Sequence, residues 1–257
     1  MSMITGLVIF FLFGLIFGSF LNVCIYRIPK GESIVWPPSH CPHCGARIKP
    51  IDNIPVVSYV MLKGKCRSCK GRISSRYPLV ELMTGFLFAG LFWKFGLSSE
   101  TLVFLVLGLL LIIISFIDID NRLILNKITL PGIVLGIFLT LSFHVLSYKQ
   151  VLLGFFIGGG GLLAVAFLGG LLFRKESMGM GDIKLAAMIG VFLGVKGVAF
   201  TLLIAFFVAA LFSIGAIALK KASRQSQIPF GPFIALASIV YLFWGQQMIH
   251  WYLRMMV

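Results

Sequence analysis

Acidic residues are scarce in this chain of 257 residues. Asp and Glu together number 8, and all charged residues make up only 12% of the sequence. A soluble domain carries roughly 25% charged residues, so a water-soluble globule is excluded because it could not cover its surface. Disorder is excluded as well, because disordered chains combine high charge with low hydrophobicity. What is abundant is apolar: 59% of the residues are hydrophobic, and the mean hydropathy is +1.04. This composition predicts a polytopic membrane protein.

Apolar runs of about the length of a membrane span, roughly 20 residues, follow one another along the chain. They lie at 3–25, 79–95, 101–117, 128–146, 151–173, 184–195, 197–219 and 230–251. The run at 184–195 is short, so we interpret it as a tilted or partly buried helix. We predict an all-α polytopic membrane protein of about eight transmembrane helices, divided into a first helix (1–26), a polar loop (27–77) and a transmembrane core (78–257).

Glycines recur four residues apart within several of these runs. Such spacing lets membrane helices approach each other closely, so we interpret the pairs as packing positions and not as a binding site. The pairs are Gly14/Gly18, Gly132/Gly136, Gly154/Gly158 and Gly190/Gly194.

The net charge of +14 is concentrated in a few connections. If the loop 27–77 is cytoplasmic and the spans alternate, the cytoplasmic connections hold 18 of the 22 Lys and Arg residues. Loops rich in Lys and Arg stay on the cytoplasmic side. We therefore interpret the basic charge as a topology signal, with both ends of the chain outside, and we expect the lipid bilayer and no nucleic acid as a partner.

The polar loop contains Cys41-Pro-His-Cys44 and Cys66-Arg-Ser-Cys69, two C-x-x-C knuckles separated by 21 residues. This spacing is typical of a zinc ribbon, in which four thiolates surround one structural Zn²⁺ and leave no open position. The alternatives are two disulfides, which a reducing cytoplasm disfavours, and cysteines without any ligand. His40 or His43 could also compete as metal ligands. We expect Cys24, in the first span, to be a small buried hydrophobe.

Half of the acidic residues fall in two short connections between spans. They are Asp118, Asp120, Glu176 and Asp182. An ionisable group at the end of a membrane helix is costly unless it is paired or hydrated. Two carboxylates held close together do not both ionise readily, so the ionised one can activate water while the protonated one polarises a carbonyl. This pattern favours aspartic-protease chemistry, with Gly179 and Gly181 allowing a substrate to approach Asp182 closely.

Two alternatives use the same acidic residues. The carboxylates could anchor the connections by pairing with basic side chains, or they could form an ion or proton path. The candidate basic partners are Arg122, Lys127, Arg174, Lys175 and Lys184.

Beyond the cysteines, further motifs follow one another in a specific order along nearly the whole chain. They are Gly18-Ser19-Phe20-Leu21-Asn22-Val23, Tyr26-Arg27-Ile28-Pro29, Asn53-Ile54-Pro55-Val56-Val57-Ser58-Tyr59, Arg76-Tyr77-Pro78-Leu79-Val80-Glu81-Leu82, Gly179-Met180-Gly181-Asp182-Ile183-Lys184-Leu185 and Ile228-Pro229-Phe230-Gly231-Pro232. In these motifs the sequence resembles the bacterial type IV prepilin peptidases, the bifunctional leader peptidase/N-methyltransferases.

The resemblance implies a multi-pass enzyme of the bacterial cytoplasmic (inner) membrane. It would cut the basic leader from prepilins of type IV pili or from pseudopilins of type II secretion, after a Gly at the cytoplasmic face. It would then methylate the new N-terminus, typically Phe, with S-adenosylmethionine. The implied site residues are the catalytic Asp118 and Asp182, the supporting Gly179, Gly181 and Lys184, the zinc ligands Cys41, Cys44, Cys66 and Cys69, and the methylation-associated Gly64.

One departure from the family pattern is Leu125, which stands where a proline is usual. Leucine in place of proline lets the following helix start earlier. Asp120 is a rival to Asp118, but residues two apart on a helix point about 200° apart, so both cannot face one partner. Three other functions remain open: a peptidase without methyltransferase activity, a proton-coupled transporter, which would need acids nearer mid-span, and a membrane adaptor that binds partners through its zinc ribbon.

Overall fold

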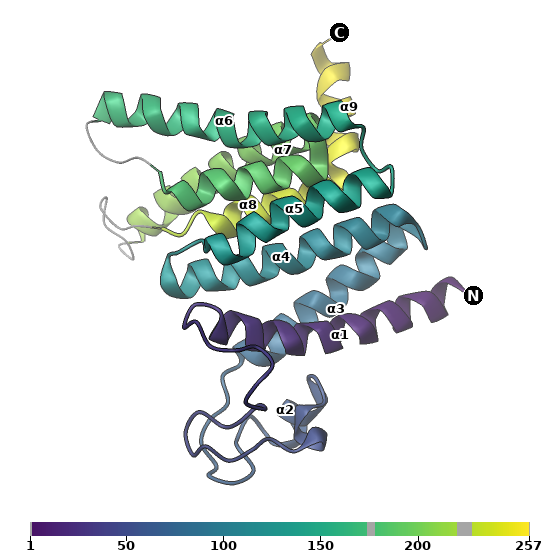
Figure 1. Cartoon of the computed structure of the whole chain (residues 1–257), viewed down its shortest axis with the longest axis vertical. Helices are drawn as coiled ribbons and strands as arrows, with labels where there is room; N and C mark the ends of the chain where they lie inside the picture. The colour runs from purple at the N-terminus through teal and green to yellow at the C-terminus, as the bar shows by residue number, and fades with distance from the viewer. Residues whose placement is uncertain (1, 174–177, 220–227, 257) are drawn as a thin grey trace. The chain divides into compact units, whose positions relative to one another are not determined.

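The computed structural model describes residues 2–173, 178–219 and 228–256, and every regular element in this part of the chain is helical. The α-helices are α1 (Met3–Arg27), α2 (Val57–Met61), α3 (Arg76–Phe95), α4 (Ser99–Asn121), α5 (Asn126–Ser142), α6 (Tyr148–Phe173), α7 (Met180–Ala218), α8 (Gly231–Val240) and α9 (Gln246–Met256) (Figure 1). A 3₁₀ turn covers Pro50–Asn53, and a π-helical stretch, Tyr241–Gly245, joins α8 to α9. The predicted all-α architecture is confirmed.

Each of the eight predicted apolar runs lies mainly in a helix. Within the described residues six helical stretches are long and apolar enough to span a bilayer: α1, α3, α4, α6, α7 and the stretch Gly231–Met255. Helix α5 is apolar but has only 17 residues. Helix α7 contains two of the predicted runs, 184–195 and 197–219. They are separated by a kink at Gly194, whose φ of 68° and ψ of −173° are not helical. Residues 185–194 are all buried, as expected for the short run at 184–195.

The chain folds into two compact units, the first reaching Thr101 and the second beginning at Leu102. In the first unit α1 packs along α3, and the polar loop connects them. In the second unit α7 packs against α5, α6 and α8 (Figure 1). The predicted division at 26/27 and 77/78 follows the polarity of the sequence, and it stays a prediction.

The paired glycines lie where helices meet, as predicted. A Cβ on Gly14 would stand 2.7 Å from Gly85 Cα, and one on Gly18 would stand 2.6 Å from Glu81 Cα, both on α3. Gly154 and Gly190 lie against each other's carbonyl groups at the crossing of α6 and α7. Close backbone approach is the usual basis of helix association in membranes.

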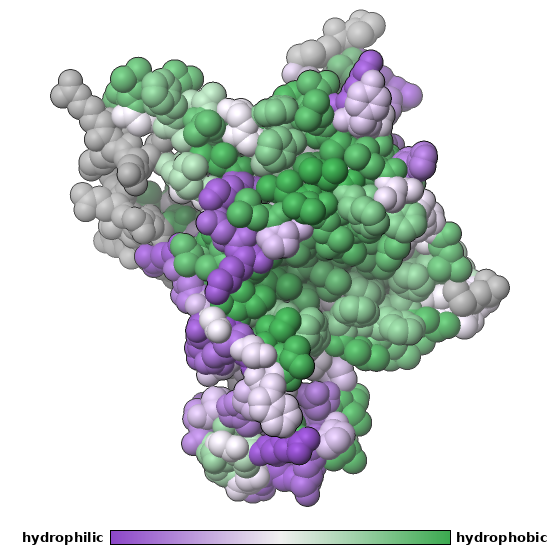
Figure 2. All heavy atoms as spheres, viewed as in Figure 1, coloured by the Kyte–Doolittle hydropathy of each residue, from purple (hydrophilic) through white to green (hydrophobic). Residues whose placement is uncertain are grey.

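The outer surfaces of the helices are apolar. Large side chains such as Ile4 (75% exposed) and Leu172 (77% exposed) point away from the protein. Figure 2 shows apolar residues spread over the helices, whereas the polar loop carries mainly hydrophilic ones. Exposed apolar surface of this extent needs a lipid environment, so the chain is a multi-pass membrane protein.

Candidate active site and metal centre

Asp118 lies in the last turn of α4, because that helix runs on to Asn121 instead of ending at the last apolar residue. Its side chain is buried, and its Oδ2 accepts a hydrogen bond from the Gly231 N–H at 2.9 Å. Gly231 is the first residue of α8, and a Cβ there would stand 2.8 Å from the same Oδ2. The first turn of α8 therefore holds the Asp118 carboxyl group in place.

Asp182 lies in the first turn of α7, which begins at Met180. Its carboxyl group is close enough to Asp118 for their charges to interact, and the backbone of Gly179 hydrogen-bonds to it. Gly181 packs on the connection between α4 and α5, where a Cβ would stand 2.7 Å from Ile124 Cβ. The structure thus places Asp182 within electrostatic range of Asp118, with Gly179 and Gly181 beside Asp182.

The other acidic and basic residues considered for this site do not contact Asp118 or Asp182 through ion pairs in the described part of the chain. Asp120 is exposed, whereas Asp118 is buried on the same helix. The Lys184 Nζ donates to Asn126 Oδ1 at 2.8 Å, which ties the start of α7 to the start of α5. In the described part of the chain neither Asp118 nor Asp182 forms an ion pair with a basic side chain. Three residues named in the sequence analysis lie outside that part: Arg174, Lys175 and Glu176.

Leu125 keeps a conformation that proline also adopts. Its φ is −81° and its ψ 129°, and α5 begins at the next residue. Proline fixes φ near −65 ± 15°, so Leu125 lies at the edge of the range that proline allows. A proline at this position would need little change in the local backbone.

Four cysteine sulfurs gather in the polar loop. The Sγ atoms of Cys41, Cys44, Cys66 and Cys69 all lie within 4.8 Å of one another, and Cys41 Sγ lies 3.9 Å from Cys69 Sγ. A tetrahedral ion with Zn–S bonds of 2.3 Å would separate its sulfurs by about 3.8 Å. The four thiolates therefore fit a structural Zn²⁺, and they occur as free cysteines in place of two disulfides.

The two knuckles repeat the same backbone pattern. The N–H of Cys41 donates to Ala46 and that of Cys66 to Gly71, at 2.9 and 2.8 Å. An antiparallel bridge closes each turn, His40 with Arg47 and Lys65 with Arg72. The backbone N–H groups of Cys69 and Ser68 lower the pKa of Cys66 to about 6, which favours the thiolate that a metal needs.

The two histidines do not join the cluster of ligands. His40 Nδ1 lies 3.2 Å from the Pro38 carbonyl oxygen, and the His43 ring packs beside Gly71. Cys24 is buried in α1, as expected.

Gly64 occupies a position that favours glycine for two reasons. Its φ is +66°, in the left-handed region, and a Cβ there would stand 3.0 Å from the Tyr59 Oη. Its carbonyl accepts the Ile73 N–H at 2.8 Å. Gly64 therefore lets the chain enter the second knuckle while the Tyr59 ring lies against it.

Two contacts were not predicted from sequence. Gly231 had been noted only within a motif, and its hydrogen bond to Asp118 spans 113 residues. Glu81 likewise appears in the sequence only as part of a motif. It is buried, and it accepts the Val56 N–H at 2.7 Å. Two features of the sequence could have indicated these contacts: the Gly231-Pro232 pair at the start of the last apolar run, and a carboxylate within an apolar helix.

The fold and the two sites together define a class, that of multi-pass membrane proteins with paired carboxylates at helix ends and a four-thiolate metal centre. Residues 12–95 match the family described as the bacterial peptidase A24 N-terminal domain, and residues 105–214 match the type IV leader peptidase family. The chain belongs to the type IV leader peptidase family, which confirms the resemblance drawn from its motifs.

Curated relatives align with this chain over nearly its full length and theirs. A prepilin leader peptidase/N-methyltransferase of Pseudomonas aeruginosa is 37% identical, over 95% of this chain and 92% of that protein. Proteins of the same name from Stutzerimonas stutzeri (36% identical, 94% and 91% covered) and Aeromonas hydrophila (36%, 95% and 92%) are similar as well. No solved structure matches the chain.

Proposed function

We propose that this protein removes the basic leader from type IV prepilins or pseudopilins, cutting after a Gly at the cytoplasmic face of the inner membrane. The observation that carries the proposal is the buried Asp118 carboxyl group, held by the Gly231 N–H and close enough to Asp182 for their charges to interact. Two carboxyl groups whose charges interact do not both ionise readily, so they share protons unequally. One of them then acts as a general base and the other as a general acid.

In this mechanism the ionised carboxylate takes a proton from a water molecule, which attacks the scissile carbonyl carbon. The protonated carboxyl group donates to the carbonyl oxygen and stabilises the developing charge. Collapse of the tetrahedral intermediate breaks the C–N bond, and a proton passes to the leaving amine. Gly179 has no side chain to cover Asp182 Oδ2, which a Cβ there would approach to 3.3 Å, so an extended substrate backbone can reach this carboxyl group. No acyl-enzyme forms, because water itself is the nucleophile.

The second proposed activity is N-methylation of the new N-terminal residue, typically Phe, with S-adenosylmethionine as the methyl donor. It is supported by the names of the curated relatives. Zn²⁺ held by the four cysteines would give the polar loop a fixed shape, since a closed four-thiolate site is structural.

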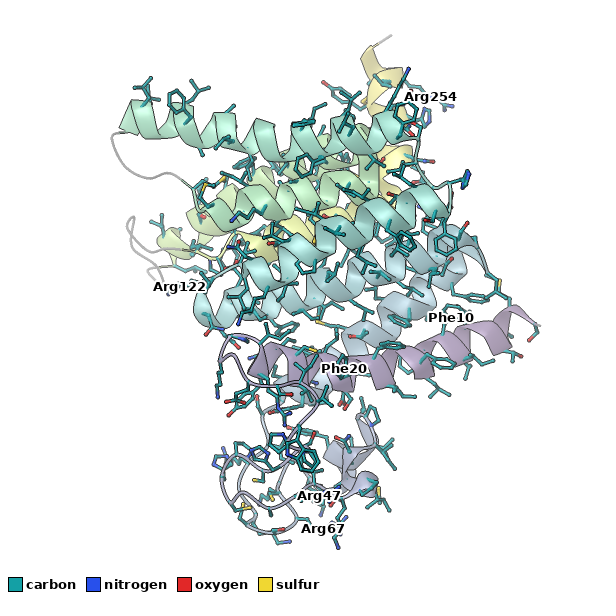
Figure 3. The ribbon with its side chains drawn as sticks, in the orientation of Figure 1. Phe10, Phe20, Arg47, Arg67, Arg122 and Arg254 are labelled. Carbon is teal, nitrogen blue, oxygen red and sulfur yellow. The ribbon has the colours of Figure 1, made fainter. Side chains whose placement is uncertain are left out.

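The cytoplasmic placement of the polar loop and the carboxylate pair rests on charge. Cytoplasmic loops of membrane proteins carry the excess of Lys and Arg, and the loop between α1 and α3 holds the largest group of basic residues in the chain. Arg47 and Arg67 are two of them, and Arg122 follows the end of α4 (Figure 3). All these segments would face the cytoplasm.

The direct test is leader cleavage by aspartate variants in membranes that contain a co-expressed prepilin. Asp118→Asn and Asp182→Asn should each reduce cleavage by about 10³-fold or more, because each removes one partner of the acid–base pair. Asp120→Asn is the matched control on α4 and should keep most of the activity. Normal processing by either of the first two variants would refute the assignment.

Mass spectrometry of the same prepilin separates the remaining functions. Loss of the leader marks a peptidase, and the further gain of one CH₂ marks a methyltransferase. Loss of the leader without that gain would identify a peptidase-only homologue. An unchanged prepilin would favour a transporter or an adaptor.

A further inference from the structure

A cavity of about 370 Å³, lined by both apolar and charged side chains, lies between α1, α3 and the polar loop, all within the first unit. Its size is that of a site for a drug-sized ligand or cofactor. None of the leader-cleavage residues lines it, because Asp118 and Asp182 belong to the second unit. The mechanism of cleavage therefore leaves this cavity without a role.

The cavity is lined by more basic than acidic side chains, and its two carboxylates differ in their partners. Five basic residues line it, and two carboxylates accompany them, Asp52 and Glu81. Asp52 forms a bidentate pair with Arg67, at 2.6 Å for the shortest contact. Glu81 instead accepts hydrogen bonds from two neutral groups, the Val56 N–H at 2.7 Å and the Ser19 side chain. The basic residues are Arg27, Arg47, Lys49, Arg67 and Arg72; Figure 3 labels Arg47 and Arg67.

Glu81 is nine-tenths buried, at 7% exposure. A carboxylate has about four acceptor positions, so the two donors present leave capacity for a ligand. Val56 presents its N–H from an unfavourable backbone conformation, φ 61° at a β-branched residue. Strain of this kind persists where the surrounding structure fixes it, and it is common at functional sites.

We propose that this cavity is the binding site of S-adenosylmethionine, with the Glu81 carboxylate against the sulfonium group. The inference rests on the proposed methyltransferase activity. A sulfonium cation in a chain of net charge +14 needs a local negative partner, and Glu81 supplies it. The rings of Tyr59 and Tyr77 also line the cavity and offer faces for the adenine. The carboxylate of S-adenosylmethionine would lie against the basic residues that line the cavity.

A second cavity adjoins the first and suits the methyl acceptor. It is about 560 Å³ in volume, is lined mainly by apolar side chains such as Phe20 and Val35, and shares Ser19, Val23 and Arg27 with the donor cavity. An N-terminal Phe would fit there with its amine directed to the shared wall. After losing a proton to water, the amine attacks the methyl carbon. The C–S bond breaks towards sulfur, giving S-adenosylhomocysteine and a secondary ammonium.

Binding to the purified full-length protein tests the proposal without relying on turnover. The dissociation constants of S-adenosylmethionine and of S-adenosylhomocysteine, which lacks the positive charge, are measured by titration calorimetry. Glu81→Gln should raise the dissociation constant of S-adenosylmethionine by about 10- to 100-fold, as expected for loss of a charged partner. It should raise the dissociation constant of S-adenosylhomocysteine much less. Glu32→Gln, at an exposed loop residue outside the cavity lining, is the control and should leave both constants unchanged.

Three outcomes would overturn the proposal. Unchanged affinity of Glu81→Gln for both ligands would place the donor elsewhere while leaving the methyltransferase activity intact. If Glu81→Gln weakened the binding of both ligands equally while the protein kept its zinc, Glu81 would have only a structural role. A wild-type protein that neither binds the donor nor methylates would refute the proposed activity together with its site.

A second measurement needs no variant. An azido-adenine analogue of S-adenosylmethionine is photo-crosslinked to the wild-type protein, and the labelled peptides are mapped. Label is expected within residues 19–81, on peptides containing Tyr59 or Tyr77. Label confined to residues 102–257 would contradict the assignment even if Glu81→Gln failed to fold.

Discussion

At the scale of single residues, the position of one carboxyl group depends on a glycine far away in sequence. Gly231 donates its N–H to Asp118 from the start of α8, and a side chain at this position would meet the carboxylate oxygen at 2.8 Å. A hydrogen bond to a charged group contributes about 1.5–3 kcal/mol. The position of the Asp118 carboxyl group thus depends on backbone that lies far away along the chain.

Gly231→Ala should therefore slow leader cleavage by about 10-fold or more, because the added methyl group displaces the carboxylate from the N–H. The measurement is the rate of prepilin cleavage by the purified variant. Gly160→Ala is the matched control, since a Cβ there meets open space within α6. Equal rates for both variants would show that the Gly231 contact does not support catalysis.

The zinc ligands give a second residue-scale prediction. Cys66→Ser should lower bound zinc well below one ion per chain, because a four-thiolate site loses a quarter of its ligands. Zinc is measured by elemental analysis of the purified protein. Cys24→Ser, buried in α1 away from the cluster, should keep the full complement. Zinc retained by Cys66→Ser would point to a different ligand set.

At the scale of elements, the crossing of α6 and α7 is built on glycine. Gly154 and Gly190 face each other with their backbones in contact, and Gly158 lies against Ala186 on α7. The half of α7 before Gly194 is buried between its neighbours. Because Asp182 lies in the first turn of this half, the packing of α6 against α7 also sets the position of the carboxylate.

Gly154→Ala should destabilise the protein by about 1–3 kcal/mol, the usual cost of overpacking, since the new Cβ would meet the Gly190 carbonyl. Thermal unfolding in detergent, followed by tryptophan fluorescence, measures the change. Gly161→Ala lies on the same helix where a Cβ meets no neighbour, and it should be neutral or slightly stabilising. A lower midpoint for Gly161→Ala than for Gly154→Ala would argue against this packing.

At the scale of the whole molecule, the distribution of basic residues predicts the orientation in the membrane. Leu97→Cys, in the connection between α3 and α4, should react with a membrane-impermeant maleimide in intact spheroplasts. Leu123→Cys, between α4 and α5, should react only after permeabilisation. Both side chains are well exposed, at 75% and 52%, so access to reagent decides the result. The reverse pattern would invert the proposed topology.

Much of the architecture could be predicted from the sequence because its signals are local. A span needs an unbroken apolar run, and a metal knuckle needs two cysteines at fixed spacing, so both are visible within a few residues. Helix ends were predicted less well. Asp118 and Asp182 were placed in connections, whereas both lie inside helical turns, because polar residues at a membrane surface can continue a helix as readily as end it.

The helical membrane class, the cysteine pairs and the family can all be predicted from the sequence alone, since composition and short motifs are enough to identify each of them. Three features follow from the folded structure and not from any sequence motif. Asp182 lies within electrostatic range of Asp118, Gly231 holds Asp118, and Glu81 lines a cavity beside the polar loop. The physical reason is separation along the chain. Contacts between residues 25 to 113 positions apart depend on how whole helices pack, and no local pattern encodes that packing.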